Sequence, residues 1–130
     1  MARARVLLVD DNQAILATTA SLLQLHFEIV GAVTDGKSAL DAFAGCRPDV
    51  VVLDISMPVM DGIEAARLLR KSDPAARIVF HTVDRSAALL EAAQETGAFG
   101  YVVKARMRTD LVQAIEAALT DRQFFSPGPE

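Results

Sequence analysis

The chain has 130 residues, a length that suits one domain with a single hydrophobic core. Hydrophobic residues make up 52% of it and charged residues 23%, which excludes a disordered chain, and the net charge of −4 argues against direct binding of a nucleic-acid backbone. A single cysteine excludes an intrachain disulfide, and no apolar run approaches the ~20 residues of a membrane span, so we expect a cytoplasmic protein with no membrane partner.

Short apolar runs alternate with longer helical patterns along the chain. Strands are predicted at residues 5–9, 28–33, 50–53, 77–80 and 100–103. Several of these runs are continuous apolar blocks, which is typical of strands covered on both faces. Helices are predicted at residues 13–25, 37–44, 63–71, 87–96 and 108–120. Gly45 and Gly97 are predicted to end the second and fourth helices, and Ser86 is predicted to cap the fourth.

This alternation predicts an α/β fold, a (βα)₅ doubly wound parallel sheet with the flavodoxin-like strand order 2-1-3-4-5. We expect one domain over residues 1–122. The last residues include the stretch FFSPGPE, which contains two prolines and a glycine. Residues 123–130 are therefore predicted to be a C-terminal linker or tail.

Acidic residues follow two of the predicted strands. Asp10 and Asp11 come directly after the first strand, and Asp54 directly follows the third. Open α/β sheets bind ligands beyond the carboxyl ends of their strands, at the point where the strand order reverses, so these three carboxylates should share one crevice. Their mutual repulsion requires a proton or a cation. A site with only oxygen ligands predicts Mg²⁺, with Mn²⁺ as an alternative.

Two further strand ends add a hydroxyl group and an ammonium group to the same edge. Thr82 ends the fourth predicted strand and Lys104 follows the fifth. Together with the acids they predict a site that handles phosphoryl groups, with Asp54 as the nucleophile. Taken one at a time, each acid could be a helix or turn cap and the lysine a surface residue. Their combination at successive strand ends favours the functional interpretation.

The stretches VLLVDDN, PDVVVLDISMPVMDG, HTV and GYVVKA resemble the motifs of receiver domains of two-component response regulators, and the resemblance covers essentially the whole chain. It implies that a sensor histidine kinase transfers a phosphoryl group to Asp54. It also implies that Asp10, Asp11, Asp54 and the backbone carbonyl of Ser56 hold Mg²⁺, and that Thr82 and Lys104 contact the phosphoryl group. Such a domain is a phosphorylated switch that catalyses only its own phosphorylation and dephosphorylation.

The resemblance also implies an output. Tyr101 matches an aromatic position that turns inward as Thr82 moves, which changes the surface made by the fourth helix, fifth strand and fifth helix. The final helix resembles that of receivers that precede a LuxR-type helix-turn-helix domain. We therefore expect control of transcription, with DNA bound only through an output domain absent from these 130 residues. The chain is then either a truncated regulator, which we favour, or a receiver that works alone. Its switching surface could form a homodimer.

Two residues depart from the family pattern. Ala105 stands where the family commonly has proline, preceded by a cis peptide bond; with alanine there a cis bond is costly, and the sequence leaves open whether the bond after Lys104 is cis or trans. Val83 stands where a small residue is common, and we expect it to shield the phosphoryl group from water. Asp84 and Ser56 are further residues that could tune that step. His81 should point to the face of its strand opposite Thr82, as a partly exposed structural residue.

Two other functions stay open. A phosphatase of the haloacid dehalogenase type also uses an aspartyl nucleophile with Mg²⁺, although its nucleophile follows the first strand. A degenerate receiver would be an interaction module that never takes phosphate, and the complete set of site residues argues against it.

Overall fold

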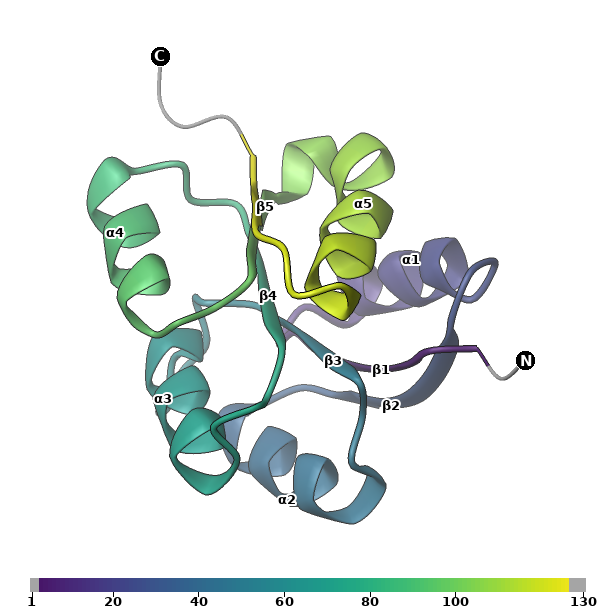
Figure 1. Ribbon diagram of the computed structural model, residues 1–130, viewed down its shortest axis with the longest axis horizontal. Coiled ribbons are helices and arrows are strands. Elements are labelled where there is room, and N and C mark those ends of the chain that lie inside the picture. Colours follow the sequence, from purple (N-terminus) through teal and green to yellow (C-terminus); the bar gives the residue numbers. More distant parts are fainter. Residues whose placement is uncertain (1–2, 127–130) are drawn as a thin grey trace.

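The computed structural model describes residues 3–126 as a six-stranded parallel sheet flanked by helices (Figure 1). The strands are β1 (Arg5–Val9), β2 (Glu28–Val33), β3 (Val50–Leu53), β4 (Ile78–Thr82), β5 (Gly100–Val103) and β6 (Phe124–Phe125). The helices are α1 (Gln13–Leu23), α2 (Gly36–Cys46), α3 (Gly62–Ser72), α4 (Ala87–Glu95) and α5 (Met107–Leu119), with a 3₁₀ turn, η1 (Lys104–Arg106). The sheet order is β2-β1-β3-β4-β5-β6, which confirms the predicted flavodoxin-like arrangement.

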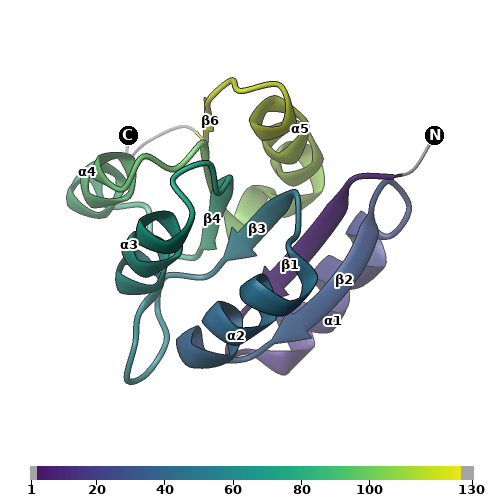
Figure 2. The same cartoon turned by 60° about the horizontal axis from the view of Figure 1, so that its bottom comes forward.

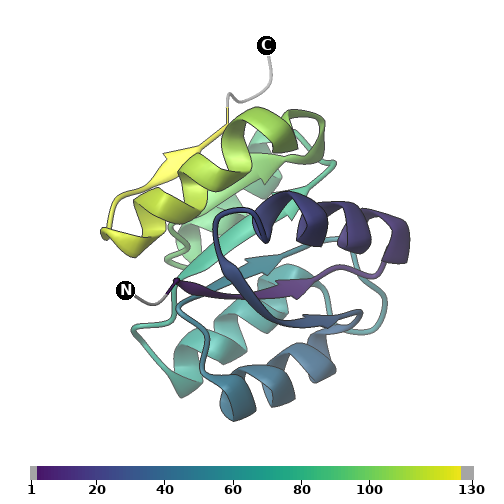
Figure 3. The same cartoon turned by 90° about the vertical axis from the view of Figure 1, so that its right-hand side faces the viewer.

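The sheet separates two hydrophobic cores. Helices α1 and α5 cover one face, and α2, α3 and α4 cover the other (Figures 1 and 3). Alternate residues of each strand enter opposite cores: in β1, Val6 and Leu8 join the core under α1 and α5, whereas Leu7 and Val9 join the other. Both faces are therefore covered, which explains why the strands are apolar without alternation. Within residues 3–126 no helix combines the length and apolar character needed to span a membrane.

The predicted capping residues of α4 are confirmed, whereas the predicted end of α2 is not. Ser86 caps α4 and Gly97 follows it with φ of +84°, both as predicted. The prediction that Gly45 ends the second helix is wrong, because α2 continues to Cys46. Arg47 instead ends α2 in the left-handed conformation, with φ of 47°. The guanidinium of Arg5, from β1, donates hydrogen bonds to the carbonyl groups of Cys46 and Arg47 at this helix end. This tertiary contact satisfies the helix end at a residue other than glycine.

The sixth strand was not predicted. Residues 123–130 are predicted above as a linker or tail, but Phe124 and Phe125 pair with β5 and extend the sheet (Figure 2). Phe124 packs in the core under α5, and Phe125 packs in the core on the α4 side. The two aromatic residues can fill both cores at the sheet edge, and the chain-breaking Pro127 comes only after them. Residues 127–130, like residues 1–2, lie outside the described part of the chain.

Candidate functional site

Neighbouring strands bring three carboxylates together at one edge of the sheet. Val9, the last residue of β1, pairs with Leu53, the last residue of β3, so Asp10 and Asp54 follow side by side. Carboxylate oxygens of Asp10, Asp11 and Asp54 all lie within 4.8 Å of one another. Asp10 and Asp54 are buried, with 4% and 3% of their surface exposed, whereas Asp11 is exposed. The cluster is therefore buried on one side and open to solvent on the other.

The side chain of Lys104 reaches this cluster from the end of β5. Its Nζ lies 2.6 Å from Oδ2 of Asp10 and 3.5 Å from Oδ2 of Asp54. The lysine side chain is 10% exposed, so the ammonium group is largely withdrawn from water. A buried ammonium group between two carboxylates offsets part of their mutual repulsion.

The pKa of Asp54 shows that this compensation is incomplete. Burial first, and then the charges of Asp10 and Asp11, raise the pKa of Asp54 from 3.8 to about 6, although Lys104 acts in the opposite direction. The ionised form of Asp54 is thus costly in the folded chain. A cation beside Asp54 would favour that form.

The donor set of the cluster fits a hard divalent cation. Asp10, Asp11 and Asp54 supply only oxygen atoms, and the exposed side chain of Asp11 leaves access to water. Magnesium prefers such sites, in which carboxylates and several waters complete its coordination. Ser56 lies on the exposed loop two residues after Asp54. Its role as a carbonyl ligand stays a prediction.

The start of α3 packs directly against the backbone of Asp54. The amide of Gly62 donates to the carbonyl of Ile55 at 2.8 Å, and Asp61 caps the helix. A Cβ atom at Gly62 would lie 2.1 Å from the carbonyl oxygen of Asp54, a distance that real contacts do not reach. In the sequence Gly62 shows only as a turn residue. The structure adds that glycine is needed there for close approach of two backbone segments.

Thr82 and Tyr101 are joined through the β4–α4 loop. Thr82 is fully buried at the end of β4, and its Oγ1 accepts a hydrogen bond from the Asp84 amide at 3.4 Å. Tyr101 is 2% exposed, and its hydroxyl donates to the carbonyl of Asp84 at 2.7 Å. Burial, together with a smaller contribution from the charge of Asp84, raises the pKa of Tyr101 to about 12. Val83 is 67% exposed between these two contacts.

The expectation that His81 is partly exposed is wrong. His81 is 2% exposed and lies against α1, beside Leu16 and Thr19, on the side of the sheet opposite Phe80. Burial lowers the pKa of His81 to about 4, helped by the charge of Lys104 and opposed by that of Asp10. The strand pattern indicates the face of His81 correctly, but only packing of α1 determines its exposure. Among the described residues all peptide bonds are trans, including the bond between Lys104 and Ala105 that the sequence left open.

Known proteins resemble this chain in sequence and fold. Residues 6–116 match the response regulator receiver domain family. Protein CcdB of Bacillus subtilis is 34% identical over 116 residues, which cover 88% of this chain and 97% of CcdB. Transcriptional regulatory protein LnrK of the same organism is 32% identical over 113 residues, covering 85% of this chain and 51% of LnrK, so this chain spans about half the length of LnrK. A LuxR-family two-component response regulator from Aurantimonas sp. SI85-9A1 has a crystal structure that matches with a TM-score of 0.93 at 38% identity, covering 97% of this chain and 91% of that one.

Proposed function

This chain belongs to the response regulator receiver family, and on that basis we propose that Asp54 accepts a phosphoryl group from a sensor histidine kinase. The observation that carries the proposal is the cluster of Asp10, Asp11 and Asp54 with the Lys104 ammonium group between two of its members. A set of acids and one lysine at the carboxyl ends of parallel strands suits transfer of an anionic group.

The transfer forms one bond and breaks another. An oxygen of ionised Asp54 attacks phosphorus, the P–N bond of the donor phosphohistidine breaks, and its electron pair returns to the imidazole. With a pKa of about 6, Asp54 is mostly ionised at neutral pH. The Lys104 ammonium group, 3.5 Å from Asp54, would stabilise charge on the transferred group, and the Thr82 hydroxyl would donate a hydrogen bond to it.

A divalent cation belongs to the same proposal. Asp10, Asp11, Asp54 and the carbonyl group of Ser56 would hold Mg²⁺, or Mn²⁺ in its place. When bound, the ion supplies positive charge toward the phosphoryl oxygens.

The acyl phosphate would act as a signal through Thr82 and Tyr101. It replaces one negative charge on Asp54 by about two and adds acceptor oxygens, so it favours arrangements in which Thr82 and Lys104 face Asp54. Tyr101, joined to the β4–α4 loop, would pass that change to the surface formed by α4, β5 and α5. We propose that this surface mediates homodimer formation. Support for a transcriptional output, through a DNA-binding domain outside these residues, comes from the names of LnrK and the Aurantimonas regulator.

Incubation with acetyl phosphate and Mg²⁺, followed by intact mass measurement, tests the proposal. We expect one phosphate adduct, formed as Asp54 displaces acetate, in the parent chain and in an Asp41→Asn control, which changes an exposed carboxylate on α2. The adduct should be absent from Asp54→Asn and from samples with EDTA. No adduct with any donor would support a degenerate receiver, and sustained turnover of small phosphate esters would support a phosphatase.

A further inference from the structure

The C-terminal strand is held by buried polar contacts as well as by pairing with β5. Ser126 is 3% exposed, and its amide donates to the carbonyl of Tyr101 at 2.7 Å. Its hydroxyl donates to Oδ2 of Asp110 at 2.8 Å. A buried hydroxyl paired with a buried carboxylate makes a directional contact, which fixes the position of the segment more narrowly than apolar packing does.

Asp110 is itself at the centre of a network on α5. It is 4% exposed and accepts hydrogen bonds from Arg106 at 2.8 Å and from Thr109 at 3.1 Å. Burial raises the pKa of Asp110, but hydrogen bonds from Arg106, Ser126 and Thr109 together hold that pKa below its usual value. The carboxylate therefore stays ionised and available to Ser126 at neutral pH.

These contacts lead from Ser126 to the candidate phosphoryl site along two routes. The first runs through the backbone of Tyr101 to its hydroxyl, then to Asp84 and the hydroxyl of Thr82. The second runs through Asp110 to Arg106, the last residue of the η1 turn that begins with Lys104. Both routes end at a residue that the proposed function places on the phosphoryl group.

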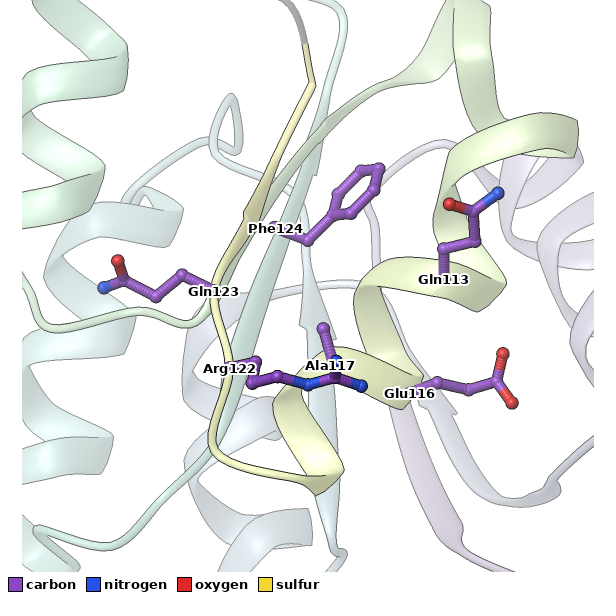
Figure 4. A pocket seen from close by; sticks show the side chains of 6 residues that line it. All are labelled: Gln113, Glu116, Ala117, Arg122, Gln123 and Phe124. Carbon is purple, nitrogen blue, oxygen red and sulfur yellow. The ribbon is translucent and has the colours of Figure 1, made fainter.

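Strand β6 also covers part of the surface between α4 and α5. It lies beside β5 with α4 on one side and α5 on the other (Figure 1). In Figure 4, Phe124 points from the strand toward α5 beside Gln113, while Gln123 points to the other side. A groove of about 360 Å³ runs along this edge between α5 and β6. If β6 detaches from β5, the hydrogen-bonding edge of β5 and the apolar surface that Phe124 and Phe125 cover become accessible to solvent or to another chain.

We propose that Ser126 and Asp110 form a latch that holds β6 on the β5 edge, and that occupation of the Asp54 site by a phosphoryl group releases it. This inference rests on the proposed function. In the described arrangement Lys104 is engaged with Asp10 and the Thr82 hydroxyl with the Asp84 amide. A phosphoryl group on Asp54 competes with Asp10 for Lys104, and as an acceptor it draws the Thr82 hydroxyl toward Asp54, so it perturbs both routes to Ser126. By linkage, weakening the latch must also strengthen binding at Asp54, by at most the factor by which the latch is weakened.

Hydrogen exchange on the parent chain tests the release directly. Beryllofluoride with Mg²⁺ serves as the phosphoryl mimic. We expect the amides of Phe124 and Ser126, which donate to carbonyls of Phe99 and Tyr101, to exchange at least about fivefold faster with the mimic than without it. Amides in the middle of α2 serve as the internal control. Unchanged or slower exchange of the two β6 amides, with the mimic bound, overturns the proposal.

Reciprocity gives a second and independent readout. Tyr101 is the only tyrosine and the chain has no tryptophan, so tyrosine fluorescence follows the mimic titration at the switch residue. We expect Ser126→Ala and Asp110→Asn each to bind beryllofluoride about fivefold more tightly than the parent, and the double variant no more tightly than either. Ser21→Ala, at an exposed serine on α1, is the matched control.

The outcomes separate the two proposals. Normal beryllofluoride binding by the parent, with equal affinity in the latch variants, overturns the latch and leaves the phosphoacceptor function in place. Failure of the parent to bind the mimic or to form the acetyl phosphate adduct removes the proposed function, and the latch with it.

Discussion

Replacing Asp54 by asparagine should stabilise the folded domain at neutral pH when no divalent cation is present. The pKa of Asp54 rises from 3.8 to about 6, first through burial and then through the charge of Asp10. The folded chain therefore binds this proton more tightly than the unfolded chain, and ionisation of the group costs folding free energy. Asparagine keeps nearly the same size and carries no charge.

The pKa values set the sign and size of the effect. Below pH 3.8 the proton is bound in both states, and as the pH rises through about 6 the wild-type chain loses stability that the variant keeps. At 1.36 kcal/mol for each pH unit, the upper limit is about 3 kcal/mol. Solvent screens the site beside exposed Asp11, and the variant loses the attraction to Lys104. We therefore expect a gain of about 1–2 kcal/mol at pH 7.5.

Urea unfolding followed by circular dichroism measures this gain. The wild-type chain, Asp54→Asn and the exposed control Asp41→Asn are compared in EDTA at pH 7.5 and pH 4.5. The gain of Asp54→Asn should shrink at the lower pH, and the control should show none. Mg²⁺ at a hundred times its dissociation constant should stabilise the wild type by about 2.7 kcal/mol and so reverse the difference. If Asp54→Asn is no more stable than wild type at pH 7.5, or gains equally at both pH values, the ionised carboxylate is not the destabilising group.

Three other outcomes are expected. Gly62→Ala should destabilise the domain by at least about 2 kcal/mol in urea unfolding, because its Cβ would lie 2.1 Å from the Asp54 carbonyl oxygen. Gly45→Ala, where α2 leaves free space for a Cβ, should instead stabilise the domain by about 0.5–1 kcal/mol. Equal effects of the two substitutions would contradict the packing argument. His81 has a pKa of about 4 in the folded chain and 6.5 in the unfolded chain, so between these pH values the unfolded chain binds more protons. The free energy of unfolding of the wild type should therefore fall by up to about 3 kcal/mol as the pH drops from 6.5 to 4. The same unfolding series on His81→Leu should lack this loss, and an identical pH profile would argue against a buried neutral imidazole. Val83→Ala should speed loss of the Asp54 phosphate, followed by intact mass over time, and an unchanged or slower rate refutes the shielding role of this exposed valine.

Strand order and strand ends explain how much of the site could be predicted. A strand covered on both faces is apolar throughout, so runs such as residues 50–53 show in the sequence without knowledge of any contact. Once the order 2-1-3-4-5 is assumed, the residues after β1 and β3 must be neighbours, which places Asp10 beside Asp54. The position of Lys104 at the same edge follows from the end of β5 in the same way.

The features that sequence reasoning missed depend on tertiary contacts. Strand β6 is two residues long, and its pairing exists only because β5 offers a free edge with a core on each side. Burial of His81 depends on packing of α1, which no local pattern around the histidine reports. The end of α2 at Arg47 depends on a guanidinium group from β1. In each case the deciding partner is more than 20 residues away or on another layer of the fold.

The charges at the site connect its stability to its chemistry. Three carboxylates and one ammonium group leave two negative charges when all are ionised, and the ammonium group lies closer to Asp10, at 2.6 Å, than to Asp54, at 3.5 Å. The ammonium group therefore balances the negative charge of Asp54 less than that of Asp10, which agrees with the raised pKa of Asp54, about 6. A divalent cation would bring the four groups to neutrality and lower that pKa, because it favours the ionised carboxylate. Ionised Asp54 is also the nucleophilic form. The imbalance that costs stability without a cation thus makes cation binding favourable and, under the proposed function, couples it to the ionised state that would accept a phosphoryl group.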